Sequence, residues 1–246
     1  MIDYTAPNRA RAAAIPREAH EEPILARPHQ PRITREMATR AALDIIDRGG
    51  LDHFSLTLVS RSLGVKSPSL YHHFRDKSEL LAEIPRHILR TINFRPGAGD
   101  SWEERTLRLC VEARRGLLEH PHAAPLILQF FPRHSLLTAY EQAVKDYPEA
   151  SEDRLGILDG IEKLTFGSAL FEAASRARGI PSMPAVDAGR FPNLARAIAR
   201  ESTDSEATFV AAMRIFLAGV RHGSEAPDRR KAARSGHSDI APVRYT

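Results

Sequence analysis

The feature that most constrains the fold is the stretch from Thr57 to Lys77, Thr-Leu-Val-Ser-Arg-Ser-Leu-Gly-Val-Lys-Ser-Pro-Ser-Leu-Tyr-His-His-Phe-Arg-Asp-Lys. Its pattern predicts a short helix, a glycine turn and a second short helix. We expect Ser67 to cap the second helix and Pro68 to occupy its first position, where the missing N–H costs nothing. Leu70 and Phe74, four residues apart, are expected to face inward.

The second helix carries more polar and aromatic side chains than three short helices can bury, because Tyr71, His72 and His73 follow one another. A helix-turn-helix accounts for this surplus, since its second helix enters the major groove of DNA and presents its side chains there. One alternative is that Tyr71 is a core aromatic residue. A metal site at His72 and His73 is disfavoured, because adjacent residues on a helix point about 100° apart and no third ligand follows.

A helix is expected before this unit, from Thr34 to about Arg48, because Thr34 can cap its start and Gly49-Gly50 can stop it. Its apolar stripe, at spacing i, i+4, i+7 and i+8, is Ala38, Ala42, Ile45 and Ile46. The polar residues expected mainly off this stripe are Thr39, Arg40, Asp44 and Asp47. Ser55 is the expected cap of the next helix, which should run from Leu56 to Leu63.

Several motifs of this region resemble, in register, the N-terminal domain of the TetR family of transcriptional regulators. They are Ala41-Ala42-Leu43, Gly50-Leu51, Leu63-Gly64-Val65, Ser-Pro-Ser-Leu-Tyr-His-His-Phe from Ser67, and Asp-Lys-Ser-Glu-Leu-Leu from Asp76. The resemblance covers roughly residues 33 to 81. Beyond residue 81 it concerns only the architecture, a larger helical body behind the DNA-binding domain.

The resemblance implies a set of residues that contact DNA: Ser55, Thr57, Ser67, Ser69, Tyr71, His72, His73 and Lys77. Hydroxyl groups can donate to phosphate oxygens or base edges, and Lys77 can neutralise a phosphate and make binding depend on salt. Thr57 and Leu58 stand where many family members carry a longer polar or basic residue. We therefore expect no arginine fork on guanine here, and the operator sequence does not follow from the chain.

The rest of the sequence predicts an all-α fold of about nine or ten helices, because no strand-like alternation occurs. A fourth helix is expected to start near Asp76 or Lys77. Further helices are expected at Ser101–Glu119, Leu126–Phe131, Ser135–Tyr147, Ser151–Arg178, Phe191–Glu201 and Ser205–His222. Ser101 and Glu104 have the spacing of a capping box. The expected organisation is a flexible arm (1–31), a three-helix helix-turn-helix domain (32–80), a ligand-binding and dimerisation domain (81–222) and a disordered tail (223–246).

Two segments have open interpretations. The proline-rich arm is either a disordered tail or a basic arm that touches DNA through Arg27 or Arg32. Pro85 falls inside the fourth helix, where a proline removes one N–H and clashes with the carbonyl of Leu81, so a kink or a break is expected. In the family the corresponding helix joins the DNA-binding domain to the body, so the kink is either a hinge or a passive bend.

The body is expected to bind a small molecule and to form the dimer. Two helices, 151–178 and 205–222, are apolar or small on more than one side, and the family places its four-helix dimer interface on two such helices; the alternative is that both are simply core. The candidate ligand-lining residues are His87, Cys110, Arg114, Leu128, Phe130, Phe131, His134, Phe166 and Leu170. Cys110 is expected to be an inert buried thiol rather than a redox sensor.

Composition excludes several classes. The 246 residues include one cysteine, which leaves no internal disulfide or zinc set, and 35 Lys and Arg against 31 Asp and Glu permit but do not establish nucleic-acid binding. No membrane-length apolar run or secretory signal is present, so a cytoplasmic protein is expected. No catalytic constellation or cofactor motif appears, so we expect neither an enzyme nor a cofactor.

These features together predict a homodimeric regulator that binds double-stranded DNA at a palindromic operator. We expect a repressor that an unidentified small-molecule effector releases. The alternative is the same DNA-binding unit under the control of a protein partner.

Overall fold

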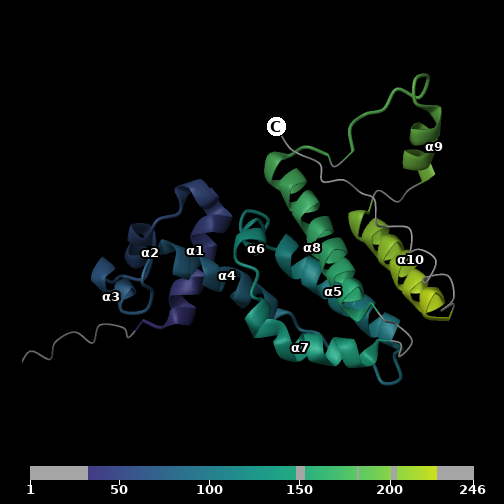
Figure 1. Ribbon diagram of the computed structural model, residues 1–246. Helices are drawn as coiled ribbons and strands as arrows, with labels where there is room; N and C mark the ends of the chain where they lie inside the picture. The colour runs from purple at the N-terminus through teal and green to yellow at the C-terminus, as the bar shows by residue number, and fades with distance from the viewer. Residues whose placement is uncertain (1–32, 148–152, 182, 201–203, 226–246) are drawn as a thin grey trace, which may run out of the picture. The chain divides into compact units, whose positions relative to one another are not determined.

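The computed structural model describes residues 33–147, 153–181, 183–200 and 204–225 (Figure 1). Over these ranges the protein forms ten α-helices and one short 3-10 helix, and no strand occurs within them. The predicted all-α fold is therefore confirmed. None of the helices in this described part is long and apolar enough to cross a membrane.

The head, residues 33–76, consists of α1 (Arg35–Gly49), the 3-10 helix η1 (Leu51–His53), α2 (Leu56–Ser62) and α3 (Ser67–Tyr71). The predicted cap of α1 is confirmed, because the Thr34 hydroxyl accepts a hydrogen bond from the backbone N–H of Met37 at 3.1 Å. Ser55 caps α2 in the same way, accepting from the N–H of Leu58 at 3.2 Å. Both hydroxyls satisfy N–H groups that the helix itself leaves free.

The predicted cap of α3 is wrong. Lys66 occupies the N-cap position without a side-chain hydrogen bond, and Ser67 is the first helical residue, so Pro68 is the second. The Ser67 hydroxyl does not cap α3 because it pairs with the hydroxyl of Ser60 on α2, 3.1 Å away. This pair joins the two helices of the helix-turn-helix across its turn.

Three of the four residues of the predicted apolar stripe, Ala38, Ala42 and Ile46, are buried in the core of the head. Its other buried side chains include Phe54, Val59, Leu70 and Phe74. Ile45 is only half-buried, and Thr39, which was expected off the stripe, is buried. Its burial is tolerated because the Thr39 hydroxyl donates to the carbonyl of Arg35 at 2.8 Å, so the polar group has a partner.

Helix α4 (Lys77–Thr91) is capped by Asp76, whose carboxylate accepts from the N–H of Glu79 at 2.8 Å. The helix continues through Pro85, so the expected break does not occur, and the proline ring is buried. Helix α4 contacts α1 in the head and α5 and α6 further along the chain. Leu80, Ile84 and Ile88 belong to one apolar cluster with Leu117 and Leu126.

The body, residues 101–225, contains the remaining helices: α5 (Trp102–Leu118), α6 (Leu126–Gln129), α7 (Arg133–Asp146), α8 (Arg154–Arg178), α9 (Pro192–Arg200) and α10 (Ser205–Glu225). The predicted capping box of α5 is confirmed, with both the Ser101 and the Glu104 hydrogen bonds present. Helix α6 ends at Gln129, two residues early, because Phe130 leaves the helical conformation. Helix α7 starts directly after Pro132, and α10 runs to Glu225 instead of His222.

Helix α8 contacts α5, α7 and α10, and α5 also contacts α10. A second apolar cluster fills their shared interior and consists of Cys110, Tyr147, Ile157, Ile161, Phe209, Met213 and Leu217. The expected starting residue Ser151, the end residue Glu201, the arm to residue 32 and the tail from 226 lie outside the described residues.

Candidate nucleic-acid interface and effector site

Helix α3 turns its polar residues away from the core. Leu70 and Phe74 are buried, whereas His72 is exposed and Tyr71 has 56% of its surface exposed. The core alternative for Tyr71 is therefore wrong. On the second helix of a helix-turn-helix, an exposed phenol can reach the major groove.

The serine and threonine candidates differ in their exposure and in the hydrogen bonds that their hydroxyl groups already make. Thr57 is exposed on the first turn of α2. Ser55 is half-buried and its hydroxyl accepts as the cap of α2, which leaves its O–H able to donate, while the Ser67 hydroxyl pairs with that of Ser60. Ser69 is half-buried on α3. Thr57 is therefore the hydroxyl among these four that is most available to a phosphate.

Lys77 lies at the start of α4, and its ammonium group donates to the carbonyl of Phe54 at 3.1 Å and sits 5.2 Å from the Phe54 ring centroid. These contacts hold the cation beside the start of α2. His73 has a half-buried side chain, and its carbonyl accepts a hydrogen bond from Arg35. All eight predicted DNA-contacting residues thus lie between Ser55, the cap of α2, and Lys77, the first residue of α4.

The sequence reasoning missed further cations in this region. The side chain of Arg75, between α3 and α4, is 89% exposed, and Arg61 and Lys66 are also exposed. Each can approach a phosphate without losing a buried contact. The signal was present in the sequence as basic residues within and next to the predicted helix-turn-helix.

In the body, the structure brings together the aromatic candidates. Phe131 and Phe166 meet edge to face with their ring centroids 5.0 Å apart. Leu170 packs, like these two rings, against the first apolar cluster. This aromatic pair joins the start of α7 to the middle of α8.

A polar group lies beside this pair that the sequence reasoning missed. Glu162 on α8 is buried, its carboxylate accepts a hydrogen bond from the Tyr140 hydroxyl, and it lies 3.1 Å from the Arg133 guanidinium. Burial, together with the carboxylate of Glu162, raises the pKa of Tyr140. The signal was an acidic residue between Ile161 and Thr165 on the buried side of a helix.

Cys110 and Arg114 are both buried on α5. Burial raises the pKa of the Cys110 thiol to about 11, so the thiol stays protonated near neutral pH. Arg114 is only 2% exposed. It donates from Nε to Ser168 and from Nη2 to Ser205, each at 3.0 Å. Arg114 thereby fastens α5 to α8 and α10.

The other ligand candidates differ in burial. His87 is half-buried on α4, where burial and the nearby Arg40 and Arg90 lower its pKa. Leu128 and His134 are exposed. Phe130 lines a surface hollow together with Arg35. The role of the nine candidates in ligand binding therefore stays a prediction.

Comparison with known families gives two matches in sequence order. Residues 38–84 match the bacterial regulatory proteins of the tetR family, and residues 95–223 match the Tetracyclin repressor-like C-terminal domain. The chain is 26% identical over 195 residues to the tetracycline repressor protein class D of Escherichia coli, which covers 76% of this chain and 89% of that protein.

Solved structures show the same fold. A possible TetR family transcriptional regulator from Streptomyces coelicolor A3(2) matches with a TM-score of 0.61 and 27% identity, over 77% of this chain and 99% of that chain. ActR from Streptomyces coelicolor, solved in complex with actinorhodin, matches with a TM-score of 0.61 and 23% identity, over 78% and 98% of the two chains. With a helix-turn-helix head and a helical body that both match, the chain belongs to the TetR family of ligand-responsive, DNA-binding transcriptional regulators.

Proposed function

We propose that this regulator is a repressor that binds a palindromic operator as a homodimer and leaves it when a small-molecule effector binds. The observation that carries the proposal is the outward face of α3, where the exposed Tyr71 and His72 are backed by the buried Leu70 and Phe74. Such a helix has a fixed inner face and an outer face that is free to meet bases and phosphates.

The proposed DNA contacts are Ser55, Thr57, Ser67, Ser69, Tyr71, His72, His73 and Lys77, to which we add Arg75. Hydroxyl and imidazole groups of α3 would reach base edges, while Thr57, Lys77 and Arg75 would hold phosphates. Most of the affinity would then come from phosphate contacts and would fall as the salt concentration rises.

Apolar surface on α8 and α10 supports the homodimer. Phe171 on α8 is 81% exposed and Ile215 on α10 is 75% exposed. One turn from each lies a glycine, Gly167 and Gly219, where an added Cβ would meet nothing within 4 Å. A large apolar side chain beside open space on each helix suits the close packing of a second copy, and such a contact is self-complementary in a symmetric dimer.

The interior of the body supports an organic effector. The Phe131–Phe166 pair offers aromatic surface, and Glu162 with Tyr140 and Arg133 offers charged and hydrogen-bonding groups beside it. Apolar walls with a few placed polar groups are typical of small-molecule sites. ActR, which shares the fold, is solved with the small molecule actinorhodin.

Selection from a random pool of DNA duplexes by the full-length protein tests the proposal. We expect enrichment of an inverted repeat whose half-sites lie about one helical turn apart, roughly 34 Å. A reporter promoter that carries the selected sequence should lose transcription when the protein is present. Failure to enrich any sequence at low salt, or a rise in transcription, would contradict the DNA-binding and the repressor parts respectively.

A further inference from the structure

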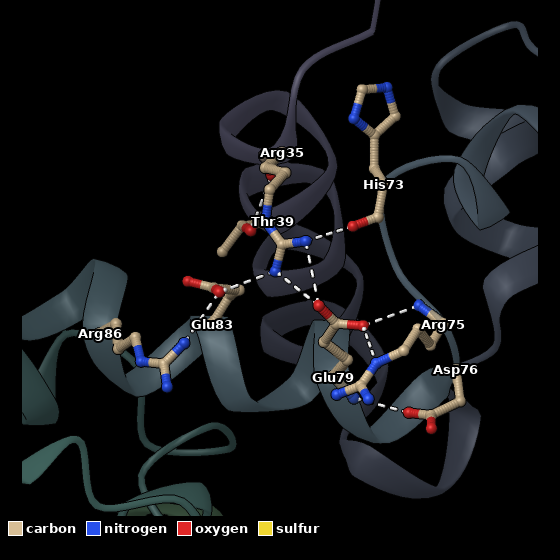
Figure 2. Close-up of polar contacts among 8 residues, drawn as sticks. All are labelled: Arg35, Thr39, His73, Arg75, Asp76, Glu79, Glu83 and Arg86. Atoms are coloured by element: carbon tan, nitrogen blue, oxygen red, sulfur yellow. Dashed lines mark hydrogen bonds and ion pairs between the residues drawn. The ribbon is translucent and has the colours of Figure 1, made fainter. Parts of the chain in front are cut away.

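The first residue of α1, Arg35, reaches across the head to two other segments (Figure 2). Its Nη1 donates to the backbone carbonyl of His73, two residues after the end of α3. Both terminal nitrogens lie 3.1 Å from Oε1 of Glu79, and Nη2 lies 2.9 Å from Oε1 of Glu83. One side chain therefore connects the start of α1, the end of α3 and the first two turns of α4.

The same guanidinium also has an apolar contact, because its central carbon lies 4.3 Å from the centroid of the buried Phe74 ring. A planar guanidinium can stack on a ring and donate in its own plane at the same time. Both features fix its orientation. Arg35 is thus held by several contacts at once, unlike an ordinary surface arginine.

Glu79 extends the connection to the other side of the same turn. Its Oε2 accepts from the backbone N–H of Arg75 at 2.7 Å and from the Arg75 Nε at 3.2 Å. The two backbone groups that flank residue 74, the carbonyl of His73 and the N–H of Arg75, are therefore both satisfied by side chains from other helices. Glu83 is also shared, because Arg86 donates to its Oε1 at 2.9 Å.

Helix α3 needs such a connection because it is short. It has five residues, and Leu70 is its one buried side chain. The contact between Ser67 and Ser60 holds the start of this helix, and the bond from Arg35 to the carbonyl of His73 holds the segment that follows it. The outward direction of Tyr71 then depends on where the turn at residues 73–75 is held.

We infer that Arg35 is a positioning residue for DNA recognition, which sets the pose of α3 by tying the turn behind it to α4. This inference rests on the proposed function of α3 as the DNA-reading helix. Arg35 acts through α3 and Arg75, and both of its terminal nitrogens already donate to partners within the protein. A direct contact of Arg35 with a phosphate is the competing role, and the two roles differ in their effect on salt dependence.

Arg40 provides the matched control. It lies on the same helix and pairs with Glu36, one turn away, at 2.6 Å, with both side chains more than half exposed. Arg40→Ala therefore removes the same charge from α1 without releasing α3. The probes are the duplex that the wild-type protein selects from a random pool and a scrambled duplex of equal length.

The test compares full-length wild-type protein with the Arg35→Ala and Arg40→Ala variants. We expect Arg35→Ala to lose about tenfold or more in affinity for the selected duplex, with a smaller loss for the scrambled one. The slope of log K against log salt should stay at the wild-type value. Arg40→Ala should bind both duplexes nearly as the wild type does.

Three results would overturn the inference. Arg35→Ala could bind the selected duplex like the wild type. It could show a salt slope shallower by about 0.9, which is the mark of one lost phosphate contact. It could lower the thermal midpoint while the folded protein keeps its affinity, which is the mark of a purely structural residue.

Glu79→Gln covers the case in which Arg35→Ala does not fold. The amide keeps the size of the side chain but weakens both ties, so it should lower specific affinity in the same direction, and wild-type affinity in this variant would count against the inference. The outcomes also distinguish a failure of this inference from a failure of the proposed function. A wild-type protein that selects no sequence overturns both, whereas a selective wild type with an equally selective Arg35→Ala overturns the Arg35 role alone.

Discussion

The ring of Phe216 on α10 occupies the space that a side chain at Gly160 on α8 would need. A Cβ built at Gly160 would come within 2.6 Å of the Phe216 ring. Phe216 packs against the second apolar cluster, so the ring has buried neighbours of its own. The glycine therefore allows α10 to approach α8 closely.

Gly160→Ala should destabilise the protein despite the better helix propensity of alanine. The clash with a packed ring costs about 1–3 kcal/mol, whereas alanine gains about 1 kcal/mol in a helix interior, so the net loss is about 1 kcal/mol. Urea unfolding measures it. Gly156→Ala is the control, because its Cβ would meet only Asp153 at an ordinary 3.8 Å. Equal stability of the two variants would contradict the close approach.

Cys110 should be unreactive in the folded protein. Its thiol is buried, and burial raises its pKa from 9.0 to about 11. Each unit of pKa lowers the thiolate fraction about tenfold. Alkylation by iodoacetamide at mildly alkaline pH should therefore be at least about a hundredfold slower in buffer than in denaturant. Rapid alkylation of the native protein would revive the redox-sensor interpretation.

The head should lose stability in acid in part through Glu79. The backbone N–H of Arg75, helped by the side chains of Arg75 and Arg35, lowers the pKa of Glu79 from 4.5 to about 2. Because the folded pKa is the lower one, this contribution is fully present above pH 4.5 and is lost as the pH falls towards about 2. Glu79→Gln should flatten the decline of unfolding free energy across that window. An unchanged decline would show that the Glu79 contacts do not persist in solution.

Removal of exposed apolar surface should separate the dimer without unfolding the protomer. Ile215→Lys on α10 and Phe171→Ala on α8 alter exposed side chains, so the thermal stability of the protomer should change little. Sedimentation velocity should show a shift from dimer to monomer. Leu128→Lys is the control, since Leu128 is equally exposed but lies on α6. A monomeric wild type, or an equal effect of all three changes, would contradict the proposed interface.

Local signals predicted much of the fold. The caps at Thr34 and Ser55 and the capping box at Ser101 depend on residues at most three positions apart, and all three are confirmed. The cap at Ser67 was wrong because its hydroxyl has a partner, Ser60, on another helix. Local pattern does not reveal which of two possible partners a hydroxyl takes once helices pack.

The sequence could not predict the contacts that position the candidate sites, because these contacts also join residues on different helices. Arg35 and Glu83 are 48 residues apart along the chain, and Tyr140 meets Glu162 on a different helix. Charged residues at these positions suit a solvent-exposed helix face equally well. Only the packing of the helices shows which charges share a partner.

Equilibrium binding of the selected duplex by Tyr71→Phe and Lys77→Ala tests most directly whether α3 reads DNA. Tyr71→Phe removes one exposed hydroxyl, so affinity should fall about tenfold, the effect of one hydrogen bond to a charged group, while thermal stability stays unchanged. Lys77→Ala should weaken binding and make the salt slope shallower by about one unit. If both folded variants bind the selected duplex with wild-type affinity and salt slope, α3 and the start of α4 are not the DNA-reading surface.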